Sequence, residues 1–376
     1  MTLHDLPTPQ VLIDRARAMR NIDRVQALAD SAGMRLRPHA KTHKSPVVAK
    51  WQIERGAVGV CCAKVGEAEV FAAAGVRDIR LPYPVNPSNA ARVLALMDRA
   101  SISIIVDHVA VARGWSDVMR RAGRSLDVLI KVDVGFHRCG IDPNGDALGF
   151  ITAVSDMPGL RVRGLLSHAG HGYHAASEQE LCNVANQEAD ILMRLRADAF
   201  AAGIELDEIS VGATPTLRFS VRQHGITELR PGNYVYFDRT QVALGAATLD
   251  DCALTVLSTV VSKPARDRII LDAGSKTLTN DQARGITKAA GFGAVMKDVG
   301  TDDDARRIDE ALTIERLSEE HATVRVTGMT TLEPGDRVRV VPNHSCVVSN
   351  LVDEVRLVEG DRVIETIAIA ARGKIQ

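Results

Sequence analysis

The chain lacks the features that mark several classes of protein. Its formal net charge is −1, so its electrostatics predict neither nucleic acid nor an anionic membrane as a partner. No apolar run approaches the ~20 residues that a membrane-spanning helix needs. The first residues, Met1 to Asp5, show no basic segment followed by an apolar one, so the sequence predicts no secretory signal.

Cysteine is also sparse, with six residues in a chain of 376. Two of them, Cys61 and Cys62, are adjacent, and the spacing matches neither a disulfide scaffold nor paired CxxC motifs. We therefore expect reduced thiols and a cytoplasmic protein.

Short apolar strands and amphipathic helical segments alternate through the first two thirds of the chain. Short strands of this kind, separated by helices, are typical of parallel strands buried on both faces. After Gly33 the predicted strands cover residues 34–37, 58–61, 78–81, 102–106, 128–132, 162–166, 208–211 and 227–230. Eight such units predict an α/β fold, a (β/α)8 TIM barrel. An open doubly wound sheet is the alternative, but no GxGxxG turn follows the first strand.

The sequence pattern changes after about residue 240, where predicted strands rich in Val, Ile and Thr replace the alternation of strands and helices. We expect a barrel over residues 1–240 and a C-terminal β-rich domain over residues 241–376. The first strand, at about residues 8–14, precedes the barrel and is expected to join the β domain. Residues 281–305, rich in Gly, Asp and Lys, are expected to form a mobile loop.

The residues with catalytic chemistry follow the predicted strands, which is where a barrel places its function. His39 and Lys41 follow the first strand, Arg138 the fifth, and His168 and Tyr173 the sixth. Chance clustering of polar residues in loops is the alternative reading. So many reactive side chain types on one rim favour a functional site.

Lys41 lies in a basic stretch that runs from Arg35 to Pro46. Pro38 prevents a continuing helix and favours extended backbone before it. A lysine at the mouth of a core beside other cations should have a lowered pKa, which favours the free amine that forms Schiff bases. For this segment alone, a solvated basic loop is the alternative.

The loops after the last two strands suit a phosphate group. They offer backbone N–H groups, a hydroxyl and the start of a short helix, and barrels often bind phosphate there. The candidate residues are Gly212, Ala213, Thr214, Gly232, Asn233 and Tyr234. Each loop alone can also be an ordinary turn. A reactive lysine on one side and a phosphate cradle on the other describe pyridoxal phosphate.

Four motifs together resemble the D-threonine aldolase and D-serine dehydratase family. They cover residues 37–44, 167–173, 210–216 and 342–346. The family consists of fold-type III pyridoxal phosphate enzymes, with an alanine-racemase-like barrel and a C-terminal β domain. The resemblance runs from Thr8 to about Leu357. It implies cofactor contacts at His39, Lys41, Arg138, Tyr173 and the two phosphate loops, and catalytic roles for Lys41 and His168.

The resemblance also implies a divalent metal held by His344 and Cys346. In an extended strand every second side chain points to the same side, so a strand at this point would place His344 and Cys346 on one face. Imidazole and thiolate suit zinc, although manganese or magnesium remain open, and two protein ligands leave positions for water and substrate. A buried cysteine beside a turn histidine is the alternative.

The implied activity is pyridoxal phosphate- and metal-dependent cleavage of small D-3-hydroxy amino acids by a homodimer. The spacing through residues 167–240 favours D-threonine aldolase, which yields glycine and acetaldehyde. A dehydratase acting on D-serine or 3-hydroxyaspartate is the alternative on the same scaffold. A cofactor carrier without turnover would resemble the barrel alone, and a metal-only hydrolase would show no visible cofactor absorbance.

Overall fold

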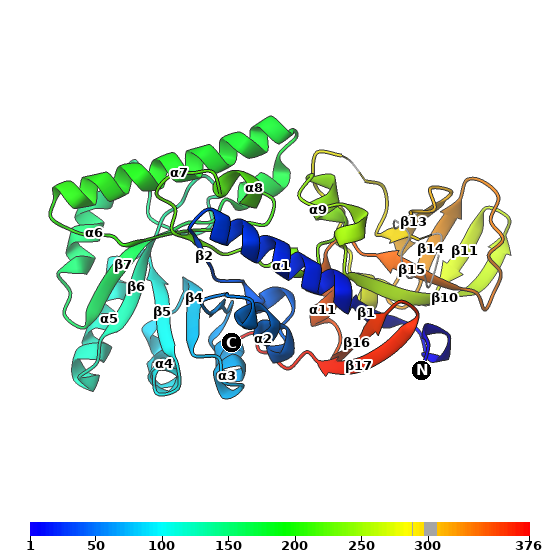
Figure 1. Ribbon diagram of the computed structural model, residues 1–376, viewed down its shortest axis with the longest axis horizontal. Coiled ribbons are helices and arrows are strands. Elements are labelled where there is room, and N and C mark those ends of the chain that lie inside the picture. The colour runs from blue at the N-terminus through cyan, green and yellow to red at the C-terminus, as the bar shows by residue number, and fades with distance from the viewer. Residues whose placement is uncertain (288, 297–306) are drawn as a thin grey trace.

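The computed structural model describes residues 1–287, 289–296 and 307–376. A barrel forms one end of the elongated molecule and a β-rich domain forms the other (Figure 1). Within the described ranges, no helix has both the length and the apolar character needed to span a membrane.

Eight parallel strands form the sheet of the barrel, in the order β2-β9-β8-β7-β6-β5-β4-β3. Backbone hydrogen bonds join the two outermost strands, from Val58 N to Leu36 O (2.9 Å) and from Cys61 N to Pro38 O (2.8 Å). The predicted (β/α)8 barrel is therefore confirmed. Its strands are β2 (Arg35–Leu36), β3 (Val60–Cys61), β4 (Asp78–Pro84), β5 (Ser101–Val106), β6 (Leu126–Lys131), β7 (Leu160–Leu166), β8 (Glu208–Val211) and β9 (Glu228–Leu229).

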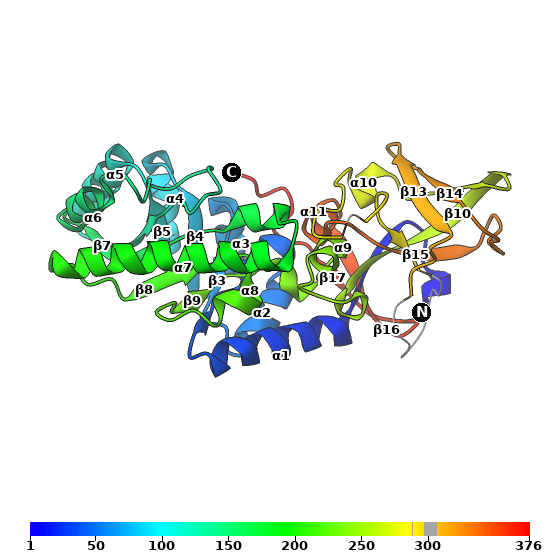
Figure 2. The ribbon, with the colours of Figure 1, turned by 90° about the horizontal axis from the view of Figure 1, so that it is seen from above.

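Helices alternate with these strands because their apolar stripes pack on the outer face of the sheet. Gly123, with φ 62°, ends one of them in the left-handed conformation that glycine adopts without strain. Figure 2 shows the longest described helix, α7, lying along one side of the barrel. The barrel helices are α1 (Arg15–Ser31), α2 (Pro46–Glu54), α3 (Val65–Ala73), α4 (Ala90–Met97), α5 (Val109–Ala122), α6 (Ala147–Ser155), α7 (Glu178–Ala201) and α8 (Leu217–Ser220).

A buried ion network joins strands across the barrel. Glu228 of β9 binds two arginines, Arg37 Nε at 2.8 Å and a guanidinium nitrogen of Arg80. Arg80 Nη2 also binds Glu208 Oε2 of β8 at 2.7 Å. Ser210 Oγ donates to Glu228 Oε1 at 2.6 Å. The shared carboxylate ties these strands into one rigid unit below the rim.

The second domain is a mixed, mostly antiparallel sheet in the order β13-β14-β11-β10-β1-β16-β17, from which β15 and β12 branch beside β10. The N-terminal strand β1 lies in this sheet, antiparallel to β10 and parallel to β16. The strands are β1 (Gln10–Asp14), β10 (Leu254–Ala265), β11 (Arg268–Leu271), β12 (Ala294–Val295), β13 (Leu312–Leu317), β14 (Ala322–Val326), β15 (Arg337–Val341), β16 (Glu354–Glu359) and β17 (Arg362–Ala368).

Short helices occur where the sequence showed little helical periodicity: α9 (Arg239–Ala243), α10 (Ser275–Leu278) and α11 (Ser345–Asn350). The expected mobile loop at residues 281–305 falls partly outside the described residues, at 288 and 297–305. Its described part contains the short strand β12, which pairs with β15.

One hydrophobic core continues from the barrel into the β domain and includes Ile22 of α1, Tyr236 and Leu254 of β10. On α1, Asn21 Nδ2 donates to the backbone carbonyls of Val235 (3.3 Å) and Asp251 (2.7 Å), which lead from one domain to the other. These contacts fix the β domain against the barrel rim.

Candidate active site

A cavity of about 540 Å³ opens where the barrel rim meets helix α11 of the β domain. Polar loops converge there because the carboxyl ends of parallel strands all meet at one rim. Of the predicted site residues, the structure brings eleven to its walls: His39, Lys41, Arg138, His168, Tyr173, Ala213, Thr214, Gly232, Asn233, His344 and Cys346.

Lys41 lies in a single 3-10 turn (Ala40–Thr42) directly after β2, and its backbone N–H donates to His39 Nδ1 at 3.4 Å. Its side chain faces the cavity and has no ion-pair partner among the described residues. Lys41 is exposed to the open cavity, and desolvation by the surrounding walls lowers its pKa. The charge of Cys346 opposes this shift, and the charge of Arg138 reinforces it. A lowered pKa makes the free amine, which is the nucleophilic form, more available.

The neighbouring lysine, Lys44, is engaged elsewhere. Its Nζ forms a buried ion pair with Glu67 Oε1 at 2.7 Å. The second oxygen of Glu67 accepts the backbone N–H of Ala63 at 2.5 Å. Lys44 is thus a structural ion-pair partner at the edge of the cavity, and of these two lysines only Lys41 has an amine that is not engaged in an ion pair.

His168 follows β7, and its Nδ1 lies 2.5 Å from the carbonyl oxygen of Gly212. A carbonyl only accepts, so Nδ1 carries the proton and Nε2 keeps a lone pair. Phe136 packs edge-on against the ring, with centroids 5.6 Å apart. Burial lowers the pKa of His168, and the charges of Lys41 and Lys131 lower it further. His168 is therefore held as a neutral base.

Arg138 lies on the loop after β6, with its guanidinium carbon 5.0 Å from the ring centroid of Phe136. Asp133 shapes this loop, since its Oδ1 accepts three successive backbone N–H groups at 3.0 Å each, those of residues 135–137. The loop carries Arg138 to the cavity wall as a cation whose ring contact fixes its orientation.

Tyr173 lies on the 3-10 helix after β7 (Gly170–His174). Its hydroxyl accepts a hydrogen bond from Gln241 Nε2 at 3.4 Å. Burial raises the pKa of Tyr173 well above its usual value. The phenol therefore stays protonated and can donate into the cavity.

The loops after β8 and β9 fit a phosphate. Thr214 Oγ1 is buried and has no hydrogen-bond partner within the described parts of the chain, so it lacks an acceptor that a phosphate oxygen would supply. At Gly232, a Cβ atom would lie 2.9 Å from Thr42 Oγ1 and 3.0 Å from His39 O. Only glycine lets the backbone pass this close to the Lys41 turn.

Two predicted cofactor residues lie outside the cavity wall. Gly212 uses its carbonyl to hold His168. The side chain of Tyr234 is fully buried, and its hydroxyl accepts from Gln52 Nε2 of α2 at 3.0 Å. The aromatic ring of Tyr234 therefore packs into the core, and the predicted phosphate contact of this residue, which relies on its backbone N–H, stays a prediction.

His344 and Cys346 both face the cavity, but the extended geometry expected for them is wrong. The strand β15 ends at Val341, His344 is the N-cap of α11, and Cys346 lies in its first turn. The thiol Sγ lies 3.2 Å from Thr42 Oγ1 and 3.3 Å from Asn233 Nδ2. A helix start therefore brings the two side chains together where a strand was expected.

Each of the two side chains shifts the pKa of the other. Burial on its own lowers the pKa of His344, but the hydrogen bond and charge of Cys346 outweigh it and raise the pKa to about 10. Burial raises the pKa of Cys346, yet the bond with His344 lowers it overall. Imidazole nitrogen and thiolate sulfur form a donor set that suits a borderline-soft divalent ion.

Two cations that sequence reasoning missed also line the cavity. Arg230, just after β9, donates from Nε to Ser210 Oγ at 2.7 Å and so links the cavity to the ion network. Lys131 ends β6, and burial together with Arg230 lowers its pKa to about 7. A lone lysine inside the apolar run Val128–Val132 was the available signal.

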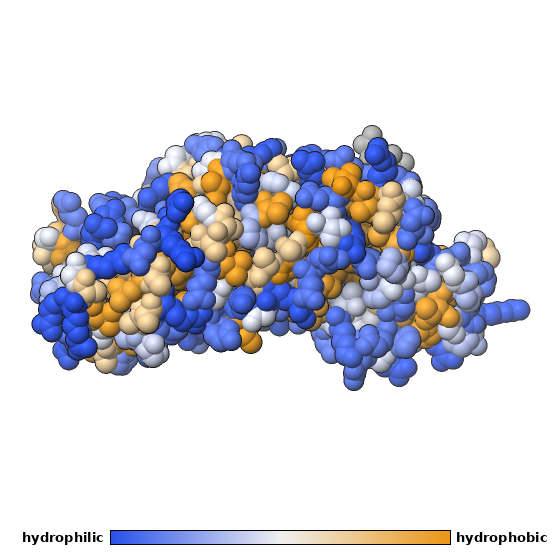
Figure 3. Space-filling model, turned by 90° about the horizontal axis from the view of Figure 1, so that it is seen from below, coloured by the Kyte–Doolittle hydropathy of each residue, from blue (hydrophilic) through white to orange (hydrophobic). Residues whose placement is uncertain are grey.

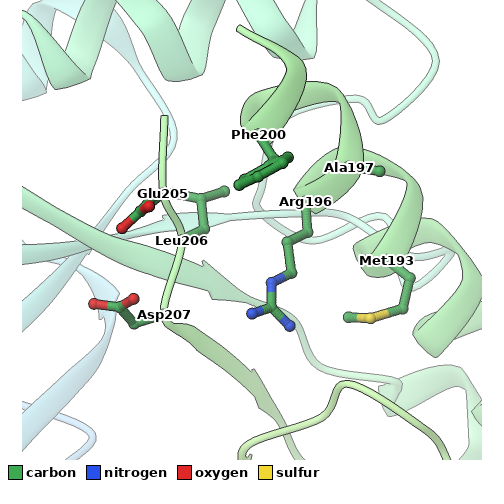
Figure 4. A pocket seen from close by; sticks show the side chains of 7 residues that line it. All are labelled: Met193, Arg196, Ala197, Phe200, Glu205, Leu206 and Asp207. Carbon is green, nitrogen blue, oxygen red and sulfur yellow. The ribbon is translucent and has the colours of Figure 1, made fainter. Parts of the chain in front are cut away.

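Another hollow of about 430 Å³ lies on the outside of the barrel, between the last turns of α7 and the segment that leads into β8 (Figure 4). It is lined by Met193, Arg196, Phe200 and Asp207, and it lies at the amino end of β8, opposite the rim that carries Lys41. The cavity with Lys41 is therefore the one that collects the reactive groups.

The geometry defines a class: a barrel enzyme with a reactive lysine and a phosphate cradle that fit pyridoxal phosphate, and a His–Cys pair that fits a metal. Family models agree with it. Residues 13–240 match the alanine racemase N-terminal domain, and residues 253–358 match a putative serine dehydratase domain. The chain belongs to the D-threonine aldolase and D-serine dehydratase family of fold-type III enzymes.

Curated relatives span almost the whole chain. A D-threonine aldolase from Arthrobacter sp is 36% identical over 97% of this chain and 93% of its own. A D-threo-3-hydroxyaspartate dehydratase from Delftia sp. (strain HT23) is 32% identical over 97% of both. These relatives are lyases, and they include both an aldolase and a dehydratase.

Solved structures agree. The Delftia dehydratase superposes with a TM-score of 0.89 at 32% identity and covers 98% of both chains. A D-threonine aldolase from Filomicrobium marinum superposes with a TM-score of 0.89 at 29% identity, over 100% of this chain and 98% of the aldolase. A mutant D-threo-3-hydroxyaspartate dehydratase described as metal-free gives 0.90 at 31% identity, with 98% of both chains covered.

Proposed function

We propose that this protein cleaves small D-3-hydroxy amino acids, with D-threonine as substrate and glycine and acetaldehyde as products. Pyridoxal phosphate would supply an electron-withdrawing ring, and a divalent metal would supply a Lewis acid for the β-hydroxyl. Lys41 would hold the cofactor, with the phosphate at residues 213–214 and 232–233. His344 and Cys346 would hold the metal.

The observation that carries the proposal is the state of His168. Its Nδ1–H donates to Gly212 O, so its lone pair at Nε2 is available in the cavity that also contains Lys41 and the His344–Cys346 pair. A neutral imidazole is the form that accepts the proton of the β-hydroxyl. Loss of this proton allows the Cα–Cβ bond to break, and a proton added at Cα completes glycine.

The dehydratase remains a second candidate, favoured by the lowered pKa of Lys41. A free lysine amine can remove the Cα proton, after which the β-hydroxyl leaves as water and the product hydrolyses to a 2-oxo acid and ammonia. The two outcomes use the same residues. They differ in which bond at Cα breaks first.

Incubation of the holoenzyme with D-threonine, D-serine and D-3-hydroxyaspartate decides between them. Glycine and acetaldehyde from D-threonine support the aldolase. A 2-oxo acid and ammonia from D-serine or D-3-hydroxyaspartate, without glycine, contradict it and identify a dehydratase. Turnover by a protein with no cofactor absorbance would contradict both.

A further inference from the structure

The imidazole of His344 is held on its far side by a carboxylate. Its Nδ1 lies 2.6 Å from Oδ2 of Asp281, a residue 63 positions earlier in the chain. An ionised carboxylate only accepts, so Nδ1 carries the hydrogen in this bond. Nε2 is then the nitrogen left for the side where Cys346 lies.

Asp281 is itself fixed in place. Its backbone N–H donates to Thr279 Oγ1 at 3.1 Å, and its carbonyl accepts from Asn343 Nδ2 at 3.0 Å. Asn343 is fully buried, and the same Nδ2 also binds Gly291 O at 2.9 Å. Thr279 has φ 67°, a strained conformation for a β-branched residue. The residue before His344 thus anchors the loop that carries Asp281.

We propose that Asp281 is a positioning residue of the metal centre, a conclusion that rests on the metal site of the proposed function. It fixes the tautomer and ring orientation of His344 so that Nε2 and Cys346 Sγ point at the same ion. Within the described ranges no three His, Cys, Asp or Glu side chains are close enough to share a metal. Asp281 therefore acts through His344.

The test measures metal binding and does not depend on turnover. Zn²⁺ is titrated calorimetrically into metal-stripped protein that retains its cofactor, for the wild type, Asp281→Ala, Asp281→Asn and Cys346→Ala. Loss of a carboxylate behind a ligating histidine typically weakens metal affinity 10–100-fold, and we expect a loss of about this size for Asp281→Ala. Asp281→Asn keeps an acceptor oxygen, so its Zn²⁺ affinity should lie between those of the wild type and Asp281→Ala.

Glu310→Ala removes an exposed carboxylate of the same domain and should leave the Zn²⁺ affinity unchanged. Cofactor absorbance and melting temperature should match the wild type in both Asp281 variants, which separates positioning from damage to the fold. Wild-type affinity in Asp281→Ala, with a loss in Cys346→Ala, overturns this inference alone. Zn²⁺ binding that is unaffected by Cys346→Ala overturns the proposed metal site as well.

Discussion

The hydroxyl of Thr42 lies 3.2 Å from the sulfur of Cys346, which joins the two domains at the active site. Thr42 follows Lys41 in the turn after β2, while Cys346 lies in the first turn of α11. Ser349 Oγ, also on α11, donates to the carbonyl of Thr42. The turn that carries Lys41 and the helix that carries Cys346 are therefore joined by one set of contacts.

Replacing Lys41 with alanine should abolish the visible absorbance of the lysine-bound cofactor and leave the fold intact. Its side chain faces the cavity and contributes little to the core. Absorbance spectra after incubation with pyridoxal phosphate, together with melting curves, measure both effects.

Lys44→Met is the control for Lys41. It removes the lysine nearest to Lys41 in the sequence and leaves Glu67 without its ion-pair partner, so it should lower stability yet keep the absorbance. Loss of the absorbance in Lys44→Met and its retention in Lys41→Ala would show that the assignment of Lys41 is wrong.

Glu228→Gln should destabilise the barrel by about 3–5 kcal/mol, since it leaves the buried charges of Arg37 and Arg80 without their shared partner. Asp78→Asn breaks a pair with Arg37 on a side chain that is 39% exposed, and it should cost no more than about 1 kcal/mol. Urea unfolding compares the two variants. Equal losses of stability in the two variants would contradict a stabilising role for the buried ion network around Glu228.

His43 should make the protein sensitive to acid. Burial lowers its pKa from 6.5 to about 4. Between these values the unfolded chain binds a proton that the folded chain does not, so stability falls as pH decreases. Over the whole window the loss from this group is about 3 kcal/mol.

The matched variant for this test is His43→Gln, which has no titratable ring. Urea unfolding at pH 7 and pH 4 should show a steeper loss of stability in the wild type than in the variant. Parallel losses in the two proteins would assign the acid sensitivity to other groups.

The barrel and much of its rim could be predicted because strand order alone determines position in a parallel barrel. Lys41 and His168 are 127 residues apart in the sequence, yet both follow strands whose carboxyl ends share one rim. Short-range patterns also identified the helices, since apolar spacing and terminal glycines are local signals.

Long-range pairing could not be predicted in the same way. The partners of Glu228 lie far away in the sequence, at Arg37 and Arg80, and no local pattern links them. The ring of Tyr234 could turn to the cavity or to the core, and only the packing against Gln52 decides. At His344 a helix start replaces the expected strand because backbone conformation there depends on contacts with the barrel.

We expect a homodimer in which the β domain closes each active site. Figure 3 shows apolar side chains gathered across the middle of one face of the molecule, where a partner subunit would exclude water. Sedimentation at assay concentration should give a dimer. A fully active monomer would contradict this arrangement.

His344→Ala and Cys346→Ala should each abolish metal-dependent turnover and retain the cofactor absorbance. The cofactor residues proposed here, Lys41 and the loops after β8 and β9, need no metal, whereas cleavage needs the β-hydroxyl polarised. Losing a direct ligand should weaken metal binding by more than the 10–100-fold that a supporting residue costs.

Cys182→Ala, a half-buried thiol on α7, is the control for thiol removal and should leave turnover and Zn²⁺ affinity unchanged. A chelator should act on the wild type as either ligand mutation does, and added Zn²⁺ or Mn²⁺ should reverse it. The thiolate favours zinc, but the open positions leave room for a harder ion. Undiminished cleavage of D-threonine by metal-free wild-type protein would show that His344 and Cys346 have only a structural role.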